Sequence, residues 1–263
     1  MMAGSVDLSG IDVRRAGRTI LQIDSLTIAS GSFVGILGTN GAGKTTLLKI
    51  CSGLIEPTRG QVRVDDVDLT RLSPWRRCSL RQRIGYIPQS TEYNAELPFT
   101  LREIVAMGRT SVRPLLNRLT REDFAIVDEW IDRLGLSDRR NQTFRSLSGG
   151  QQQKALIARA MTQDPEMLML DEPCANLDFY WKQQISEMIE RLYCETHVTV
   201  LMVSHETSVL PPACGRIVLM ADGRVVADGE PDEVLSAQVL RKAYPGDFQT
   251  VVVGGRRYTV GGV

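Results

Sequence analysis

The sequence has no net charge, few histidines and no apolar run long enough to cross a membrane. Its 263 residues contain 31 Lys and Arg against 31 Asp and Glu, a balance that argues against bulk binding of nucleic acid. The five cysteines form no CxxC pair and the two histidines adjoin no such pair, so a reducing compartment is favoured over a disulfide scaffold or zinc site. No stretch of about 18 apolar residues occurs and the N-terminus lacks the apolar region of a secretory signal, so we expect neither a membrane span nor a leader.

The composition is that of an ordinary globular protein, with 43% hydrophobic and 24% charged residues. At about 150 residues per domain, the length fits one large domain or two small ones. Short apolar runs at 33–37, 167–170 and 198–203 are typical of strands buried on both faces of a parallel sheet. Alternating positions over 6–30 predict two or three short strands, partly antiparallel, and helical spacing prevails over roughly 91–160.

These patterns predict an α/β fold in which a helical block interrupts a mostly parallel sheet. A further strand is expected over 83–87, and hairpins are expected around the turns at 221–223 and 254–255. The expected helices cover 44–51, a segment from about 100, 120 to about 134, 150–162 and 181–193.

A glycine-rich loop between an expected strand and an expected helix carries the first functional motif. Its residues match the pattern GxxxxGK[ST] and are Gly38, Thr39, Asn40, Gly41, Ala42, Gly43, Lys44 and Thr45. Such a loop turns its backbone N–H groups and a helix N-terminus toward a phosphate. Lys44 can then reach the β- and γ-phosphates of a nucleotide, and the Thr45 hydroxyl can bind Mg²⁺.

The apolar run at 167–170 ends in two carboxylates, Asp171 and Glu172. In a phosphate-loop protein the first carboxylate at such a strand end holds Mg²⁺. The second is a candidate to polarise an attacking water. By itself this pattern could equally be a solvated strand end, and it gains its meaning from the phosphate loop in the same chain.

A third motif opens the helix expected from residue 150 and reads Leu147, Ser148, Gly149, Gly150, Gln151. A serine hydroxyl and exposed N–H groups at a helix N-terminus provide a second anion-binding surface. The same five residues alone would read as an ordinary helix cap. Here they precede Asp171 by 20 residues in a chain that already contains a phosphate loop.

With this LSGGQ motif the chain resembles the nucleotide-binding subunits of ATP-binding cassette (ABC) transporters from about residue 6 to 240. The resemblance identifies Gln89 with the family's Q-loop glutamine, which senses Mg²⁺ and the γ-phosphate and couples to the membrane partner. It identifies Asp178 with the D-loop aspartate at the dimer interface, where the same residue can also cap a helix. It identifies His205, after the run at 198–203, with the switch histidine that contacts the γ-phosphate.

Two positions depart from the family pattern. Where relatives have an aromatic ring that stacks on adenine, this sequence has Arg15 or Arg14. A guanidinium can stack on a base, although a solvated surface arginine is an equal alternative. Cys174 stands where the family often has Thr or Ser, as a reactive thiol or as a small buried side chain.

The resemblance implies a P-loop NTPase fold of the RecA-like type, with an N-terminal antiparallel β subdomain and an inserted α-helical subdomain. The ABC ATPase domain would span 1–243, with its core at about 1–90 and 161–240 and the helical subdomain at about 91–160. Residues 244–263 would be a short tail forming a β-hairpin.

The resemblance also implies a nucleotide site that combines the three motifs. Glu172, His205, Gln89 and Lys44 are the expected catalytic residues, and Thr45, Gln89 and Asp171 the expected Mg²⁺ ligands. ATP would contact residues 38–46 including Thr46, together with Arg15, Ser148, Gly149, Gly150, Gln151 and Asp178. Because the motifs of one copy would face those of another, a head-to-tail homodimer is implied.

Three segments resemble importers of metal ions and metal chelates, namely 99–109, 147–160 and 204–211. This implies import of a metal ion, iron-siderophore or cobalamin through a separate permease, with an extracytoplasmic substrate-binding protein and no nucleic acid. The subunit would be cytoplasmic and peripheral on the inner face of the cell membrane. Alternatives are an exporter or lipid-trafficking ATPase, or a soluble ABC ATPase acting on DNA or ribosomes.

Overall fold

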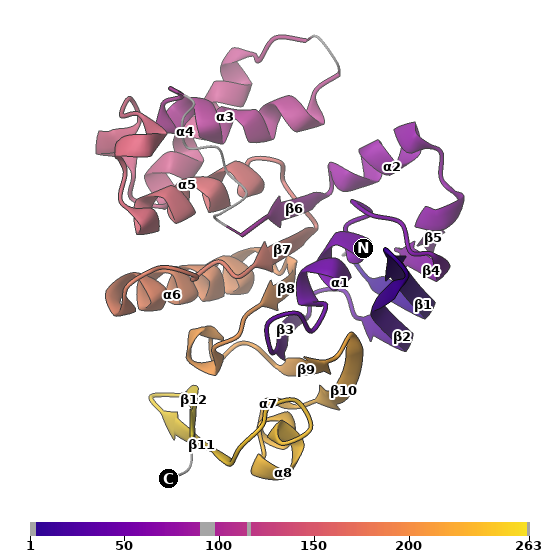
Figure 1. Cartoon of the computed structure of the whole chain (residues 1–263). Helices are drawn as coiled ribbons and strands as arrows, with labels where there is room; N and C mark the ends of the chain where they lie inside the picture. Colours follow the sequence, from indigo (N-terminus) through magenta and orange to yellow (C-terminus); the bar gives the residue numbers. More distant parts are fainter. Residues whose placement is uncertain (1–3, 90–97, 115–116, 262–263) are drawn as a thin grey trace.

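A computed structural model describes residues 4–89, 98–114 and 117–261 and has a six-stranded sheet at its centre (Figure 1). Five of its strands run parallel, and the edge strand β10 is antiparallel to β9. In spatial order the strands are β10 (Arg224–Gly229), β9 (Arg216–Ala221), β3 (Phe33–Gly38), β8 (Thr199–Val203), β7 (Met167–Asp171) and β6 (Ile84–Ile87).

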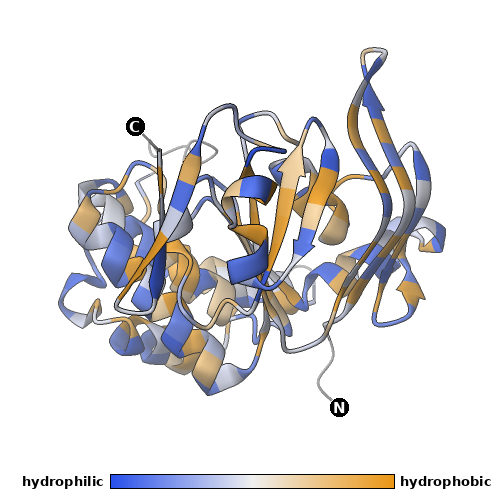
Figure 2. Cartoon of the chain, turned by 90° about the horizontal axis from the view of Figure 1, so that it is seen from below, coloured by the Kyte–Doolittle hydropathy of each residue, from blue (hydrophilic) through white to orange (hydrophobic). Residues whose placement is uncertain are grey.

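Both faces of the central sheet are buried, which explains the continuous apolar runs. Along β7, Leu168 and Leu170 belong to a core shared with the helices, whereas Met167 and Met169 belong to a second core on the other face. That second core contains residues of α1 (Lys44–Cys51) and of a separate antiparallel sheet. Figure 2 shows the hydrophobic residues running along these central strands.

The N-terminal segment forms two long strands of an antiparallel sheet. β1 (Val6–Arg15) pairs with β2 (Arg18–Ile28) on one side and with β4 (Arg59–Val64) on the other, and β5 (Val67–Asp68) completes the order β2-β1-β4-β5. The expectation of two or three short strands over 6–30 was therefore wrong in their length. Alternate side chains of β1 are buried, as the alternating sequence pattern predicts.

Helices α3 (Leu101–Val112), α4 (Arg121–Arg133) and α5 (Gly149–Met161) follow β6, the edge strand opposite β10, in the chain. The beginning of the predicted helical block, residues 91–97, lies outside the described residues. Capping boxes at Thr100 and Thr120 start α3 and α4, because each threonine and the acidic residue three positions later satisfy each other's backbone N–H groups.

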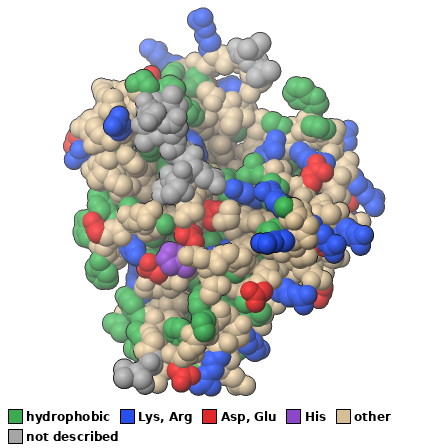
Figure 3. All heavy atoms as spheres, viewed as in Figure 1, with side chains coloured by type: hydrophobic (Ala, Val, Ile, Leu, Met, Phe, Trp, Pro, Cys, Tyr) green, Lys and Arg blue, Asp and Glu red, His purple; other side chains and the backbone are tan. Residues whose placement is uncertain are grey.

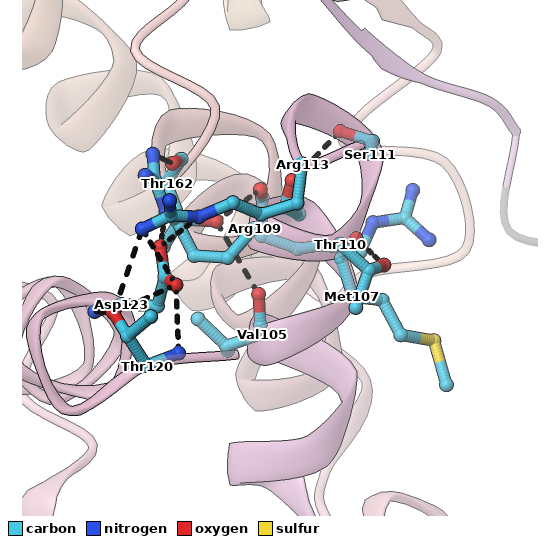
Figure 4. A network of polar contacts seen from close by, with 11 residues as sticks. Val105, Met107, Arg109, Thr110, Ser111, Arg113, Thr120, Asp123 and Thr162 are labelled. Atoms are coloured by element: carbon cyan, nitrogen blue, oxygen red, sulfur yellow. Dashed lines mark hydrogen bonds and ion pairs between the residues drawn. The ribbon is translucent and has the colours of Figure 1, made fainter. Parts of the chain in front are cut away.

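A buried carboxylate links α3 to α4 (Figure 4). The side chain of Asp123 is 0% exposed and lies 2.9 Å from Nε of Arg109 and 2.8 Å from Nη2 of Arg113. It also accepts a hydrogen bond from the Thr120 N–H at 2.9 Å. Burial alone would raise the pKa of Asp123, but hydrogen bonds from Arg113, Thr120 and Arg109 outweigh it and hold that pKa well below its usual range.

Helices α3 and α5 approach each other closely at Gly108. A Cβ atom at Gly108 would lie 2.0 Å from the carbonyl oxygen of Arg159, so only glycine fits without movement of the backbone. The contact brings the helix that begins with the LSGGQ motif against the rest of the helical block.

Helix α6 (Phe179–Thr196) is longer than the predicted 181–193, because Asp178 caps its start and His197 ends it in a left-handed conformation with φ of 53°. Helix α2 (Pro74–Arg81) was not anticipated. Within the described residues, no helix combines the length and apolar character needed to cross a bilayer.

The described part of the chain closes with small elements that lie below the central sheet in Figure 1. They are α7 (Pro231–Val234), α8 (Ala237–Leu240) and the antiparallel pair β11 (Phe248–Val253) and β12 (Arg256–Gly261). Among the described residues, four 3-10 turns connect larger elements: η1 (Leu69–Arg71), η3 (Ser137–Arg139), η4 (Phe144–Ser146) and η5 (Thr207–Val209).

Candidate functional site

The glycine-rich loop joins the C-terminal end of β3 to the N-terminus of α1. Gly38 approaches β9 so closely that a Cβ would lie 2.3 Å from the Met220 carbonyl oxygen. Gly43 precedes α1 with φ of 92°, a conformation that favours glycine, and no side chain caps the helix. The N–H groups of the first helical turn are therefore available to an anion.

Lys44 folds back over this loop. Its Nζ donates hydrogen bonds to the carbonyl oxygens of Gly38 at 2.8 Å and Thr39 at 2.9 Å. Burial lowers the pKa of Lys44, while the negative charges of Glu172 and Asp171 oppose that shift. The ammonium group is thus held at the loop by backbone oxygens and nearby carboxylates.

Asp171 ends β7 beside the start of α1 and is 0% exposed. The Thr45 hydroxyl donates to its Oδ1 at 3.0 Å, and the Tyr86 hydroxyl donates to its Oδ2 at 3.4 Å. A carboxylate and a hydroxyl so close together provide the hard oxygen ligands that Mg²⁺ prefers, so these residues fit that ion. Tyr86 was not singled out from the sequence.

Glu172 follows β7 and lies between groups from the ends of the two neighbouring strands, β6 and β8. Gln89 follows β6 and places its Nε2 3.3 Å from Oε2 of Glu172. His205 follows β8, and its Nδ1 is 3.3 Å from the same oxygen. The neighbouring register of β7 and β8, which aligns Asp171 with Val203, brings these residues together at one edge of the sheet.

The backbone of Glu172 turns sharply at the strand end. Its φ is 50°, in the left-handed region that non-glycine residues seldom adopt, and its N–H donates to the Val203 carbonyl oxygen at 3.1 Å. Backbone strain of this kind persists where the surrounding structure holds it, and it is frequent in functional sites.

A cavity of about 830 Å³ opens over the phosphate loop. Figure 3 shows a histidine beside acidic side chains on the face seen there. Of the predicted residues, those lining the cavity are Asn40, Gly41, Ala42, Gly43, Lys44, Thr45, Thr46, Gln89, Glu172 and His205. Gly38, Thr39 and Asp171 do not line it but bond to Lys44 and Thr45, which do.

The LSGGQ residues lie outside this cavity, at the start of α5. Ser148 and Gln151 form a capping box, in which the Gln151 Oε1 accepts from the Ser148 N–H at 3.0 Å and the Ser148 Oγ accepts from the Gln151 N–H at 3.4 Å. Ser148 and Gly149 are exposed, and Gly150 is buried against Trp181, whose ring a Cβ there would meet at 1.9 Å.

Asp178 is connected to the LSGGQ segment at the start of α5. Its carboxylate accepts from the Trp181 N–H at 2.8 Å, which establishes it as the N-cap of α6. The ring of Trp181 packs on Gly150, so this tryptophan joins the segment of Asp178 to the LSGGQ helix. Asp178 and the LSGGQ residues do not line the phosphate-loop cavity of the same copy, but Ala175, Asn176 and Leu177, which lead to Asp178, do.

Comparison with known proteins identifies the family. The family model described as ABC transporter matches residues 21–175, more than half of the chain. This chain belongs to the ABC transporter family.

Individual relatives of this ABC cassette agree with that assignment. A cobalamin import ATP-binding protein of Halobacterium salinarum is 37% identical over 241 residues, and the match covers 91% of this chain but 58% of that protein. A probable metal transport system ATP-binding protein of Thermotoga maritima is 32% identical over 255 residues, covering 97% and 96%. The structure of a dimeric ATP-binding cassette in a post-hydrolysis state, bound to ADP and Pi, superposes with a TM-score of 0.75 at 28% identity, covering 86% and 98%. The predicted α/β P-loop NTPase fold is thereby confirmed.

Arg15 lies at the exposed tip of the β1–β2 hairpin of this ABC cassette and does not line the cavity. Arg14, the alternative, forms an ion pair with Asp12 at 3.0 Å. Ile20, on β2, lines the cavity instead. An adenine-stacking role for Arg15 stays a prediction.

Cys174 is 4% exposed, and burial raises the pKa of its thiol to about 12. A thiol with such a pKa is protonated near neutral pH and is a poor nucleophile. Of the two interpretations of Cys174, the small buried side chain agrees with its surroundings.

Lys182 and Glu206 also line the cavity and were missed from the sequence. Lys182 of α6 places its Nζ 2.5 Å from Oε1 of Glu206, and the same carboxylate oxygen lies 3.5 Å from Nε2 of His205. Neither residue was expected at the nucleotide site, because a lysine on a helix and a glutamate after a strand carry no local signal for it. Only the packing of α6 beside the end of β8 brings them to the site.

Proposed function

We propose that this chain is the ATP-binding and ATP-hydrolysing subunit of an ABC importer for a metal ion or metal chelate. The observation that carries the proposal is the convergence of Gln89, Glu172 and His205 on the cavity formed over the phosphate loop. A nucleotide on that loop would direct its terminal phosphate toward these three side chains. Binding without turnover would not require a carboxylate there.

The residues of the loop would hold the nucleotide. N–H groups of residues 38–46 would bond the phosphates, and Lys44 would exchange its carbonyl partners for phosphate oxygens. Asp171 and Thr45, with Gln89, would hold Mg²⁺, which neutralises charge on the phosphates. Arg15 would contribute only if the tip of its hairpin met the base.

Glu172 would act on the attacking water. Its carboxylate would accept a proton from the water while the water oxygen approaches the γ-phosphorus. Gln89 and His205 would fix the orientation of the Glu172 carboxylate. Catalysis would rest chiefly on positioning and charge stabilisation, with Lys44 and His205 around the transferred group.

The working form would be a head-to-tail homodimer. Ser148 and Gly149 are exposed and lie away from the cavity of their own copy, so they are free to meet a nucleotide held by a second copy. Gly150, Gln151 and Asp178 would belong to the same interface. The similar cassette that was solved with ADP and Pi is a dimer, which supports this arrangement.

The names of two relatives, which include cobalamin import and metal transport, support a metal ion or metal chelate as the transported substrate. This chain would act with separate permease subunits and an extracytoplasmic substrate-binding protein, on the inner face of the cell membrane. The ATPase domain would span 1–243, with core segments at about 1–90 and 161–240, a helical subdomain at about 91–160 and a tail at 244–263.

Purification from its host and assay of the full chain test this function. We expect Mg²⁺-dependent ATP hydrolysis, co-purification of membrane permease subunits in detergent, and lower cellular uptake of a metal or its chelate when the protein is deleted. Absence of ATP hydrolysis would contradict the enzymatic part. Co-purification of ribosomes or nucleic acid in place of a permease would contradict the transport part and favour a soluble ABC ATPase.

A further inference from the structure

The C-terminal hairpin docks on the turn that follows His205. Strand β12 runs beside η5, and the Thr259 N–H donates a hydrogen bond to the Thr207 Oγ1 at 2.9 Å. Thr207 is two residues after His205. The hairpin is thus attached to the segment that presents this histidine to the phosphate-loop cavity (Figure 1).

Arg256 makes a second attachment from the same strand. Its Nη1 donates to the Ser186 Oγ of α6 at 2.8 Å and to the Ser208 carbonyl oxygen of η5 at 3.4 Å. Its Nη2 lies 3.8 Å from Oε1 of Glu187, and its side chain is only 13% exposed. One largely buried guanidinium therefore connects the hairpin to both α6 and the turn after His205.

Packing alone does not fix the turn on this side. A cavity of about 350 Å³ lies between the segment 205–208 and the hairpin, and its other lining residues include Leu37, Tyr244, Phe248 and Tyr258. Side chains that border a void lose the close contacts that immobilise a well-packed core. Val209 of η5 packs into the core, and Lys182 pairs with Glu206 before the turn. On the side that faces the cavity, the turn is held to the hairpin by the two polar attachments.

The other end of the segment is held by the sheet. Ser204 N–H donates to the Ile36 carbonyl oxygen at 3.0 Å, which anchors the residue before His205 to β3. His205 therefore lies between a fixed strand end and a turn that the hairpin secures. A shift of about 1 Å at a catalytic group can lower a rate on the order of 100-fold, so such anchoring has consequences for turnover.

We propose that the C-terminal hairpin is a positioning element for His205, and that Arg256 and the Thr259–Thr207 hydrogen bond exert this effect. The inference rests on the proposed ATPase function for its kinetic consequence. The position of His205 itself can be observed without turnover.

The adjacent arginine provides a matched control. Arg257 points to the other side of the hairpin, where its Nε donates to Asp232 Oδ1 of α7 at 2.6 Å. Arg256→Met and Arg257→Met each remove one guanidinium and one set of contacts from β12. Arg256→Met removes a hydrogen bond to the Ser208 carbonyl oxygen of η5, whereas Arg257→Met removes one to Asp232 of α7. The pair therefore separates a loss of hairpin stability from a loss of positioning.

Steady-state ATP hydrolysis by the full chain tests the kinetic effect. We expect Arg256→Met to lower kcat about tenfold with KM for ATP within about twofold, because nucleotide binding resides on the phosphate loop. Arg257→Met should change kcat less than about twofold, and Arg256→Lys should restore part of the loss. Equal kcat values for the two methionine variants would overturn the proposal.

The imidazole signals provide a readout independent of activity, since the chain has only His197 and His205. The NMR ring resonances of His205 should shift in Arg256→Met and stay unchanged in Arg257→Met, while those of His197 stay unchanged in both. Unchanged His205 resonances in Arg256→Met would contradict the inference. If they shift but the wild type hydrolyses no ATP, the proposed function fails and the positioning stands.

A second variant covers the case in which Arg256→Met does not fold. Thr207→Val keeps the shape of the side chain but removes the acceptor for the Thr259 N–H, and Thr207→Ser keeps that acceptor. We expect Thr207→Val to have a lower kcat and shifted His205 resonances. Thr207→Ser should have a kcat and His205 resonances near those of the wild type. Identical behaviour of the valine and serine variants would overturn the role of this hydrogen bond.

Discussion

Nδ1 of His205 lies 3.3 Å from Oε2 of Glu172, across the ends of two neighbouring parallel strands. Both residues line the cavity over the phosphate loop, and the Gln89 amide nitrogen contacts the same carboxylate oxygen. The two residues are separated by 33 positions along the chain, from 172 to 205, and only the alignment of β7 with β8 makes them neighbours. Glu172 is therefore the first residue to substitute in a test of the site.

Glu172→Gln should leave ATP binding intact and lower kcat about 100-fold or more, since an amide cannot accept the proton of the attacking water. An ATP-bound dimer should accumulate and be visible by size-exclusion chromatography. Glu129→Gln, on the exposed surface of α4, is the control and should hydrolyse ATP at the wild-type rate. Unimpaired steady-state hydrolysis in Glu172→Gln would refute the assigned role.

Lys44→Met should weaken ATP binding about 30-fold, because a hydrogen bond to a charged group contributes about 2 kcal/mol. The methionine also leaves the carbonyl oxygens of Gly38 and Thr39 without their donor. Titration with a fluorescent ATP analogue gives the dissociation constants. Lys242→Met, at an exposed position outside the cavity, should bind like the wild type, and equal affinities for both variants would exclude Lys44 from the nucleotide site.

Asp123→Asn should lower the free energy of unfolding by about 3 kcal/mol, because it breaks a buried ion pair and leaves Arg109 without its carboxylate. Urea denaturation measures the difference. Asp138→Asn, in η3, is a control that lacks any buried ion pair and should unfold at the wild-type midpoint. A loss below about 0.5 kcal/mol in Asp123→Asn would show that the network of Figure 4 contributes little.

The Asp123 carboxylate also makes the free energy of unfolding depend on pH. Its pKa in the folded chain is lowered, whereas in the unfolded chain it is about 3.9, so its contribution is complete above about pH 4. The contribution disappears as the pH falls from there through the folded pKa, when the carboxylate takes up a proton. The unfolding free energies of the wild type and Asp123→Asn should therefore differ by a constant amount from pH 7 to 5 and converge below pH 4. A constant difference down to pH 2 would contradict this linkage.

Gly108→Ala should destabilise the chain by about 1–3 kcal/mol, because the added Cβ would meet the Arg159 carbonyl oxygen of α5 at 2.0 Å. Helices α3 and α5 would have to separate. Gly215→Ala is the matched control, since a Cβ there meets nothing within 4 Å. Thermal unfolding followed by circular dichroism compares the two, and equal midpoints would show that the helices adapt without cost.

Local patterns predicted much of the fold. The run from 167 ends at Asp171 as a buried strand, and the helix expected over 44–51 is α1 with the same bounds. The helix starts at Thr100 and Thr120 were also predictable, because a capping box joins residues only three positions apart. The motif residues of the phosphate loop, with Gln89, Glu172 and His205, come together as the strand order requires.

Other features depend on contacts between distant segments. Lys182 and Glu206 enter the site only because α6 packs beside the end of β8, and Arg15 lies at a hairpin tip outside the cavity. Helix α6 extends beyond its predicted ends for a local reason: the Asp178 carboxylate caps its start, and His197 ends it in a left-handed conformation. Alternating residues show that a segment is a strand but do not give its length.

The amino-acid sequence alone determined the identity of the phosphate loop, the strand-end carboxylates and the order of the elements, since these depend on short-range hydrogen bonds and on hydrophobic periodicity. Tertiary structure decided which side chains meet. The distance of His205 from Glu172, the burial of Asp123 between two arginines and the attachment of Arg256 to the turn after His205 all join residues from separate elements. Such contacts arise when whole elements pack on a common core, and no local pattern encodes them.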